Sequence, residues 1–263
     1  TYTVPETLDT LGKCVSDLQR GNKLLITSGF DLPGAYHQLA VDPQSMKYLA
    51  FQLGDSMDNS KTFVTLPMGF SFSGALLYLV LKRYLGSMYG KNLVFYADDV
   101  VLLSTLETTK YGYYQHVNEL DSFLRGIARS GLKLHPTKTE FARFEQDFLG
   151  YRVSAEGIAP SPRHVRAIRQ FPVPRDVRQL QAFVGLINYF HKHIKDRGAL
   201  VAPLTKLFKK DEPYVWGAPQ QEAFQKLVDI LTGDAVLAHP DFEERFYLQT
   251  DASTRGIGAC LLQ

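Results

Sequence analysis

The chain has 263 residues, 45% of them hydrophobic and 21% charged, which is enough apolar material for a packed core and more length than one average domain needs. Two cysteines, Cys14 and Cys260, are too few for a disulfide framework and indicate a reducing compartment. We expect neither a secretory leader nor a membrane span, because the longest apolar run, Ala75 to Leu81, is far too short to cross a bilayer.

The net charge of +2 hides an uneven distribution. Residues 161–210 hold eleven Lys and Arg against two acids, residues 211–263 have a net charge of −6, and the first 160 residues have a net charge of −1. A basic block of this density predicts a polyanionic partner. A solvated helical surface is the alternative, but the lack of compensating acids favours nucleic acid.

The first predicted strand ends in a carboxylate. An apolar segment with Leu24, Leu25, Ile26 and Phe30 runs into Asp31 and is followed by a Pro-Gly turn. Asp31 is then either a turn or cap residue or one oxygen donor of a metal site, and the segment alone leaves both open.

Two helices are predicted next. Ser71 to Tyr89 reads as a largely apolar helix capped by Ser71 or Ser73. Residues 108–130 read as a second helix, which ends at Gly131; its apolar stripe consists of Val117, Leu120, Leu124 and Ile127.

Between these helices lies the segment FYADDVVLL, residues 95–103, with Asp98 and Asp99 flanked by apolar half-strands. The pattern predicts a β-hairpin with both carboxylates at its turn. Like charges this close raise each other's pKa unless a cation neutralises them, and oxygen ligands suit Mg²⁺. With Asp31 on a neighbouring strand, the set would suit two divalent ions about 4 Å apart, the arrangement that drives phosphoryl transfer. A solvated Asp-Asp turn is the alternative.

The remaining elements follow in order. Residues 148–160 predict a hairpin that turns at residues 155–157. A helix should begin at Pro162 and end before Pro172, and a longer one should carry Val177, Leu180, Val184, Ile187 and Ile194 on its apolar face. Alternation from Glu244 onward predicts a hairpin around residues 253–256. The order strand, helix, carboxylate hairpin, helix predicts an α+β fold, with antiparallel strands on one side and two helices on the other.

Six blocks in this order resemble a known family. They are FDLPGAYHQ (30–38), LPMGF (66–70), YADD (96–99), FLGYRVSAEGIAP (148–160), FVGLINYFHKHI (183–194) and VLAHPDFEERFYLQTDASTRGIGACLLQ (236–263). Together they resemble the reverse transcriptase and ribonuclease H region of the polyproteins of gypsy-type LTR retrotransposons and their retroviral relatives. Ala97 departs from the aliphatic residue more usual in gypsy relatives.

The resemblance implies a right-hand polymerase. Residues 1–157 would form the palm with partial fingers, 158–212 the helical thumb, 213–240 a connection, and 241–263 the first hairpin of a ribonuclease H-like α/β domain. It also implies that the finger strands carrying a triphosphate-bracing lysine and arginine are absent from the chain, and that the ribonuclease H domain is incomplete.

The resemblance also assigns roles to individual residues. Asp31, Asp98 and Asp99 would be the catalytic metal ligands, with the carbonyl of Leu32 as a further ligand. Backbone amides around Gly34 and Ala35 would face the nucleotide phosphates, and Tyr36 would be the aromatic gate against a 2′-hydroxyl. The remaining roles are Met68 beside nucleotide and template, Lys138 as the acid for pyrophosphate, Phe148, Leu149, Gly150 and Tyr151 as the primer grip, and Asp251 as the first ribonuclease H ligand.

The implied activity is RNA-directed DNA polymerisation with two Mg²⁺ ions, Mn²⁺ being an alternative, on dNTP substrates. The implied partners are an RNA template, a DNA primer and their hybrid, together with protease, ribonuclease H and integrase domains of the same polyprotein; dimerisation stays open. The implied location is intracellular, in cytoplasmic virus-like particles or in the nucleus. The rival interpretations are a catalytically inactive or domesticated nucleic-acid-binding remnant and a polymerase of another palm family.

Overall fold

A computed structural model of the protein describes residues 3–19, 24–54, 59–106, 112–209, 213–233, 237–239, 244–253 and 256–263. The chain forms two compact units, one made of Thr1–Gln146 and Pro240–Gln263, the other of Asp147–His239. Among the described helices, none is long and apolar enough to cross a bilayer.

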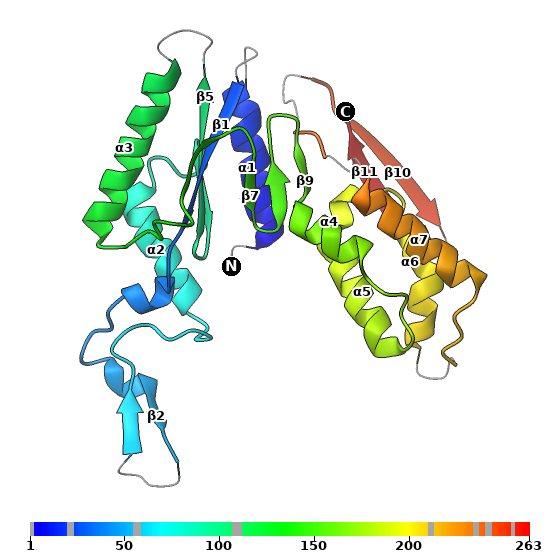
Figure 1. Ribbon diagram of the computed structural model, residues 1–263, viewed down its shortest axis with the longest axis horizontal. Helices are drawn as coiled ribbons and strands as arrows, with labels where there is room; N and C mark the ends of the chain where they lie inside the picture. The colour runs from blue at the N-terminus through cyan, green and yellow to red at the C-terminus, as the bar shows by residue number, and fades with distance from the viewer. Residues whose placement is uncertain are drawn as a thin grey trace. The chain divides into compact units, whose positions relative to one another are not determined.

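The first unit is built on a four-stranded sheet in the order β4-β5-β1-β6 (Figure 1). Its strands are β1 (Leu24–Asp31), β4 (Leu93–Tyr96), β5 (Asp99–Leu106) and β6 (Glu140–Arg143). β1 pairs antiparallel with β5 over its whole length, from Leu24 opposite Leu106 to Asp31 opposite Asp99. Both central strands are buried almost throughout, in keeping with the apolar residues at positions 24–26 of β1 and 100–103 of β5.

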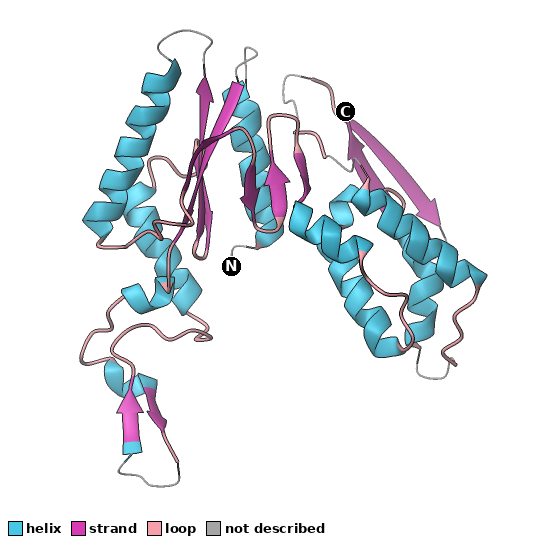
Figure 2. Ribbon diagram, in the orientation of Figure 1, coloured by secondary structure: helices cyan, strands magenta, loops and turns pink. Residues whose placement is uncertain are grey.

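Helices cover both faces of this sheet (Figures 1 and 2). α2 (Ser73–Leu85) and α3 (Gly112–Ser130) share one core with the inward residues of β1, β4 and β5, among them Phe30, Phe95 and Phe123. This confirms the predicted α+β layer. α1 (Val4–Gln19), which the sequence analysis did not predict, packs on β1, β4 and β5 with a buried face that includes Leu8, Leu11 and Val15.

A polar cluster lies inside this layer, between α3 and the central strands. His116 is buried, with Nε2 3.3 Å from the Ser28 hydroxyl and Nδ1 2.9 Å from the Ser104 hydroxyl. Ser104 donates to Glu119, so Nδ1 of His116 carries the proton and Nε2 accepts from Ser28. Burial lowers the pKa of His116, in keeping with this neutral form. The backbone N–H of Ala142 donates to Ser28 at 3.1 Å and extends the cluster to β6.

Beyond β1 the chain forms a small, largely exposed extension (Figure 1). It consists of the short helices η1 (Ala35–Gln38) and η2 (Met46–Leu49) and the antiparallel pair β2 (Ala50–Gln52) and β3 (Ser60–Thr62). Both strands are exposed along their whole length.

The second unit combines a three-stranded sheet with a helical core. The strands β7 (Gln146–Phe148), β8 (Tyr151–Val153) and β9 (Ile158–Pro160) lie in that order. The helices are α4 (Pro162–Arg169), α5 (Val177–Tyr189), α6 (Arg197–Thr205) and α7 (Ala218–Thr232), with α7 packed against α4 and α6. Apolar residues such as Phe183, Ile187 and Leu227 are buried, whereas most Arg and Lys of α4, α5 and their connections are exposed. The predicted helical module, apolar inside and basic outside, is confirmed.

The tail forms the predicted hairpin. β10 (Tyr247–Ser253) pairs antiparallel with β11 (Gly256–Leu262). The two residues between the strands, 254 and 255, lie outside the described part of the chain.

Several predicted details of the helices are wrong. α2 begins at Ser73, so Phe72 occupies the N-cap position and makes no side-chain cap, while the Ser73 hydroxyl donates to the carbonyl of Pro67. On α3, Val117 and Leu124 are exposed, whereas Phe123 and the partnered His116 are buried. α5 ends at Tyr189, and a separate 3-10 turn over His191–His193 carries the chain to the buried Ile194.

Candidate active site

Asp31 and Asp99 lie opposite each other at one end of the sheet. Asp31 is the last residue of β1 and Asp99 the first of β5, and the two are register partners. Directly opposed residues of an antiparallel pair have Cβ atoms about 4.5–5.5 Å apart on one face. The N–H of Leu32 donates to the carbonyl of Asp98 at 3.0 Å, which ties the segment after Asp31 to the hairpin turn. The fold therefore brings all three predicted carboxylates to the same edge.

The hairpin turn consists of Ala97 and Asp98, because Tyr96 and Asp99 form the last strand pair. Ala97 has φ 52°, the left-handed region, and a positive φ at the first central residue is typical of a type II′ turn. Asp98 is exposed at this turn, and Asp99 is half-buried at the start of its strand. The turn interrupts the alternation of a straight strand and lets neighbouring aspartates approach one site.

The electrostatics of this edge favour a bound cation. Burial, followed by the charges of Asp98 and Asp31, raises the pKa of Asp99 to about 6, although the charge of Lys138 acts in the opposite direction. The carboxylate form of Asp99 is therefore costly near neutral pH unless positive charge is supplied.

Lys138 supplies part of that charge. Its Nζ lies 3.1 Å from Oδ1 of Asp31, with the lysine side chain 60% exposed and the aspartate side chain 20% exposed. In the part of the chain that the structure describes, no three His, Cys, Asp or Glu side chains gather into a finished metal cluster. The converging donors are all oxygens, and burial together with the neighbouring carboxylates raises the pKa of Asp99; both properties fit a hard divalent ion such as Mg²⁺.

Tyr36 lies on η1, immediately after the turn that follows Asp31. Gly34 caps this helix with φ 54°, and Ala35 is buried beneath it. Tyr36 is half-buried, and burial raises the pKa of its hydroxyl, with the charge of Asp98 as the next cause. The hydroxyl also approaches α2, since a Cβ added to Gly74 would lie 3.8 Å from it. The structure therefore places Tyr36 beside the carboxylates.

The other predicted site residues lie elsewhere in their units. Met68 is 71% exposed in the segment after β3. Phe148 and Tyr151 are buried at the ends of β7 and β8 in the second unit. Asp251 lies in β10 opposite Gly258, and its side chain is outside the described part.

The turn between β7 and β8 has an unusual backbone. Leu149 and Gly150 have φ 49° and 75°, two consecutive left-handed residues. The Tyr189 hydroxyl donates to the carbonyl of Leu149 and the Tyr151 hydroxyl to the carbonyl of Tyr189, each at 2.6 Å. The N–H of Ser161 donates to the carbonyl of Gly150 at 3.0 Å. The turn predicted as the primer grip is therefore fixed by its own unit.

Gln38 was missed by the sequence analysis although it closes the FDLPGAYHQ block. Its amide bonds to backbone groups of Pro33 and Lys133, and the second of these is 95 residues away in the sequence. The sequence did offer a signal for Gln38, because this polar amide ends the same block that contains Asp31.

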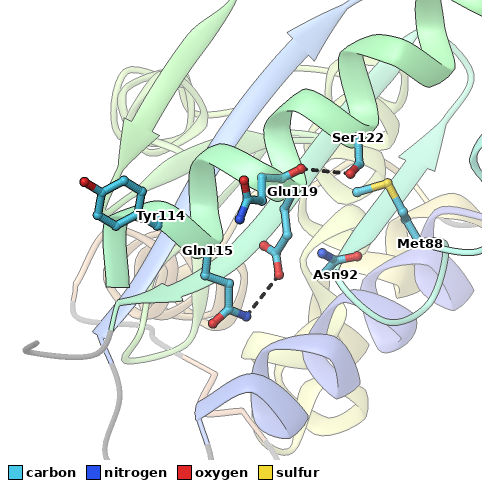
Figure 3. A pocket seen from close by; sticks show the side chains of 7 residues that line it. Met88, Asn92, Tyr114, Gln115, Glu119 and Ser122 are labelled. Atoms are coloured by element: carbon cyan, nitrogen blue, oxygen red, sulfur yellow. Dashed lines mark hydrogen bonds between the residues drawn. The ribbon is translucent and has the colours of Figure 1, made fainter. Parts of the chain in front are cut away.

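A hollow of about 470 Å³ lies elsewhere on the first unit and involves none of the predicted site residues (Figure 3). It lies between α3 and the turn before β4, and two of its lining residues are joined by a hydrogen bond, with Gln115 donating to Glu119 at 3.1 Å. Its lining residues are Met88, Asn92, Tyr114, Gln115, Asn118, Glu119 and Ser122.

Comparison with known proteins identifies the family. The profile described as reverse transcriptase (RNA-dependent DNA polymerase) matches residues 4–153, more than half of the chain and the whole carboxylate edge. The chain belongs to the reverse transcriptase family. Reverse transcriptases normally use a divalent metal ion. A second profile, described as an RNase H-like domain found in reverse transcriptase, matches residues 216–263.

The chain is also similar to curated polyproteins of retrotransposons. It is 30% identical over its whole length to the retrovirus-related Pol polyprotein from transposon 297, and 31% identical over 99% of its length to that from transposon gypsy, both of Drosophila melanogaster. The Tf2-3 polyprotein of Schizosaccharomyces pombe is 29% identical over 90% of the chain. The chain spans only 23%, 24% and 17% of these proteins, respectively.

Solved structures support the fold. A foamy viral protease-reverse transcriptase in complex with double-stranded DNA matches 91% of the chain and 41% of its own, with a TM-score of 0.74 and 21% identity. A second structure, of a foamy viral protease-reverse transcriptase in complex with an RNA/DNA hybrid, matches 95% of the chain and 35% of its own, with a TM-score of 0.74 and 19% identity. The predicted fold class is confirmed.

Proposed function

We propose that this chain carries the polymerase centre of an RNA-directed DNA polymerase, which joins a dNTP to the 3′-hydroxyl of a primer paired with an RNA template. The observation that carries the proposal is the pairing of Asp31 with Asp99 at the sheet edge, with Asp98 in the adjoining turn. Family membership and the polyprotein relatives support it.

Asp31, Asp98 and Asp99, with the carbonyl of Leu32, would hold two Mg²⁺ ions, or Mn²⁺ in their place. When bound, such ions lower the pKa of an attacking hydroxyl and stabilise the charge of a leaving pyrophosphate. The protein contributes position and charge, since the three carboxylates are set by strand register and a turn.

The residues around the carboxylates would select and orient the nucleotide. The amides near Gly34 and Ala35 would bind its phosphates, and the Tyr36 ring would collide with a 2′-hydroxyl. Met68 would contact the nucleotide and template. Lys138 would give a proton to the departing pyrophosphate, after leaving its ion pair with Asp31.

The second unit would hold the nucleic acid. The fixed turn at Leu149 and Gly150, flanked by Phe148 and Tyr151, would position the primer end. The exposed basic residues of α4 and α5 would bind phosphates of the hybrid, which gives affinity without sequence preference. The hairpin with Asp251 would begin a ribonuclease H centre, as the second family match supports. The protein would act inside the cell, in virus-like particles or the nucleus, beside protease and integrase domains. The similarity to a retrovirus-related Pol polyprotein supports a polyprotein context.

The test is dNTP incorporation on a primed poly-rA template with Mg²⁺, using this chain and a longer stretch of the polyprotein that contains it. We expect Asp98→Asn to abolish incorporation. The matched control is Asp121→Asn, which removes an exposed carboxylate paired with Arg125 on α3. Equal incorporation by Asp98→Asn and the unchanged protein would contradict the metal-site assignment. Template binding without incorporation in any form would support the non-catalytic alternative.

A further inference from the structure

Gln38 joins two loops that meet beside Asp31. Its Nε2 donates to the carbonyl of Pro33 at 2.8 Å and to the carbonyl of Lys133 at 3.2 Å. Its Oε1 accepts from the N–H of Lys133 at 2.6 Å. One half-buried amide thus satisfies three backbone groups, two of them on a loop far away in the sequence.

The loop that Gln38 binds through Lys133 also carries Lys138. The N–H of His135 donates to the carbonyl of Asp31 at 2.9 Å, and the N–H of Thr139 donates to the carbonyl of His135 at 3.1 Å. Lys138 lies between these two anchored residues, and its Nζ contacts the Asp31 carboxylate. The backbone and the side chain of Asp31 are therefore both bound by the same loop.

The ion pair needs this support. An exposed lysine loses considerable side-chain freedom when it holds one geometry, and pairs at the surface contribute little on their own. The Lys138 side chain is 60% exposed, so water competes for its ammonium group. Fixing the backbone on both sides of Lys138 reduces the freedom that the pair must overcome.

We propose that Gln38 is a positioning residue that clamps the loop of residues 133–138 to the turn after Asp31 and so keeps the Lys138 ammonium on the Asp31 carboxylate. The inference rests on the proposed function only in that Asp31 is taken to be a metal ligand of the polymerase. In a polymerase the clamp holds a proton donor beside the metal-binding edge before a nucleotide arrives.

The experiment measures the pairing without metal or nucleotide. In EDTA, the rate at which Lys138 is acetylated by an N-hydroxysuccinimide ester is read by peptide mass spectrometry, with the exposed Lys91 as the internal reference. Gln38→Leu should raise the Lys138 rate about two- to fivefold, the factor that an exposed ion pair contributes to an equilibrium. Hydrogen exchange should accelerate at the amide of Lys133, whose partner is lost. Gln44→Leu, the same change at an exposed glutamine, should alter neither.

A double-mutant cycle of Gln38→Leu and Asp31→Asn distinguishes the loss of the Lys138–Asp31 ion pair from a general increase in the mobility of the loop. The single Asp31→Asn change should also speed acetylation of Lys138, and the double variant should be no faster than Asp31→Asn alone. An unchanged Lys138 rate in Gln38→Leu would overturn the proposal, and so would a further increase in the double variant. Gln38→Glu, which keeps the acceptor for Lys133 but loses both donors, gives an intermediate rate and serves as the folded comparison if Gln38→Leu does not fold. Loss or absence of polymerase activity does not affect these readings, so the proposed function and the clamp can fail separately.

Discussion

Replacing Asp99 by asparagine should stabilise the metal-free protein while abolishing polymerisation. The folded environment raises the pKa of Asp99 from 3.8 to about 6, mainly through burial and then through Asp98 and Asp31. A difference of about 2 pKa units corresponds to about 3 kcal/mol, and solvent screening of this half-buried group reduces that to about 1.5 kcal/mol. For a unit of this size, the melting temperature should rise by about 3–6 °C.

The sign of the pH dependence follows from the raised pKa. Because the folded state binds the proton more tightly than the unfolded state, stability is lost as the pH rises from about 4 to about 6, and the full cost remains above that range. Thermal unfolding in EDTA should therefore show the full gain of Asp99→Asn at pH 7.5 and only a small gain at about pH 3.5, below the unfolded pKa. Asp121→Asn, at an exposed carboxylate paired with Arg125, is the control and should show no such pattern. A gain that is equal at both pH values, or a loss at pH 7.5, would refute the reasoning.

Three further predictions concern other parts of the site. Tyr36→Val should improve ribonucleotide use relative to dNTP use by about 10–200-fold in kcat/KM, since a steric contact of this kind is worth about 1–3 kcal/mol; an unchanged ratio would remove Tyr36 as the gate. Gly150→Ala should lower the unfolding free energy by more than about 1 kcal/mol, because its φ is 75° and the new Cβ would lie 2.8 Å from Cε1 of His164, whereas Gly185→Ala, with nothing within 4 Å, should be neutral or stabilising in the same melting experiment. Arg166→Gln on the exposed side of α4 should weaken hybrid binding at every sequence and reduce the log–log salt slope by about 1 in a titration series, and an unchanged slope would exclude a phosphate contact.

The strand ends with their carboxylates could be predicted because local patterns determine them. A short apolar run that stops at Asp31, and two such runs around Asp98 and Asp99, leave few alternatives to a strand end and a hairpin turn. The register that makes Asp31 and Asp99 partners came from the structure, because pairing depends on contacts between segments about 70 residues apart.

The details that could not be predicted depend on long-range partners. His116 is buried on α3 because Ser28 and Ser104 satisfy both ring nitrogens, and a search for apolar stripes passes over such a residue. Ser73 is the first residue of its helix rather than its cap, and its hydroxyl donates to the carbonyl of Pro67. Gln38 closes a recognisable sequence block, but its partner Lys133 is identified only by the fold. The domain limits predicted at residues 157, 212 and 240 stay a prediction.

The buried cluster around His116 affects the register in which β5 pairs with β1. A two-residue slip of β5 along β1 would keep every side chain on its own face, so the inward and outward alternation of the strand does not exclude it. The same slip would carry Asp99 roughly 7 Å from Asp31. It would also separate Ser104 from His116 and leave polar groups unsatisfied inside the protein. The hydrogen bonds of His116 on α3 therefore favour the strand register that places Asp31 opposite Asp99.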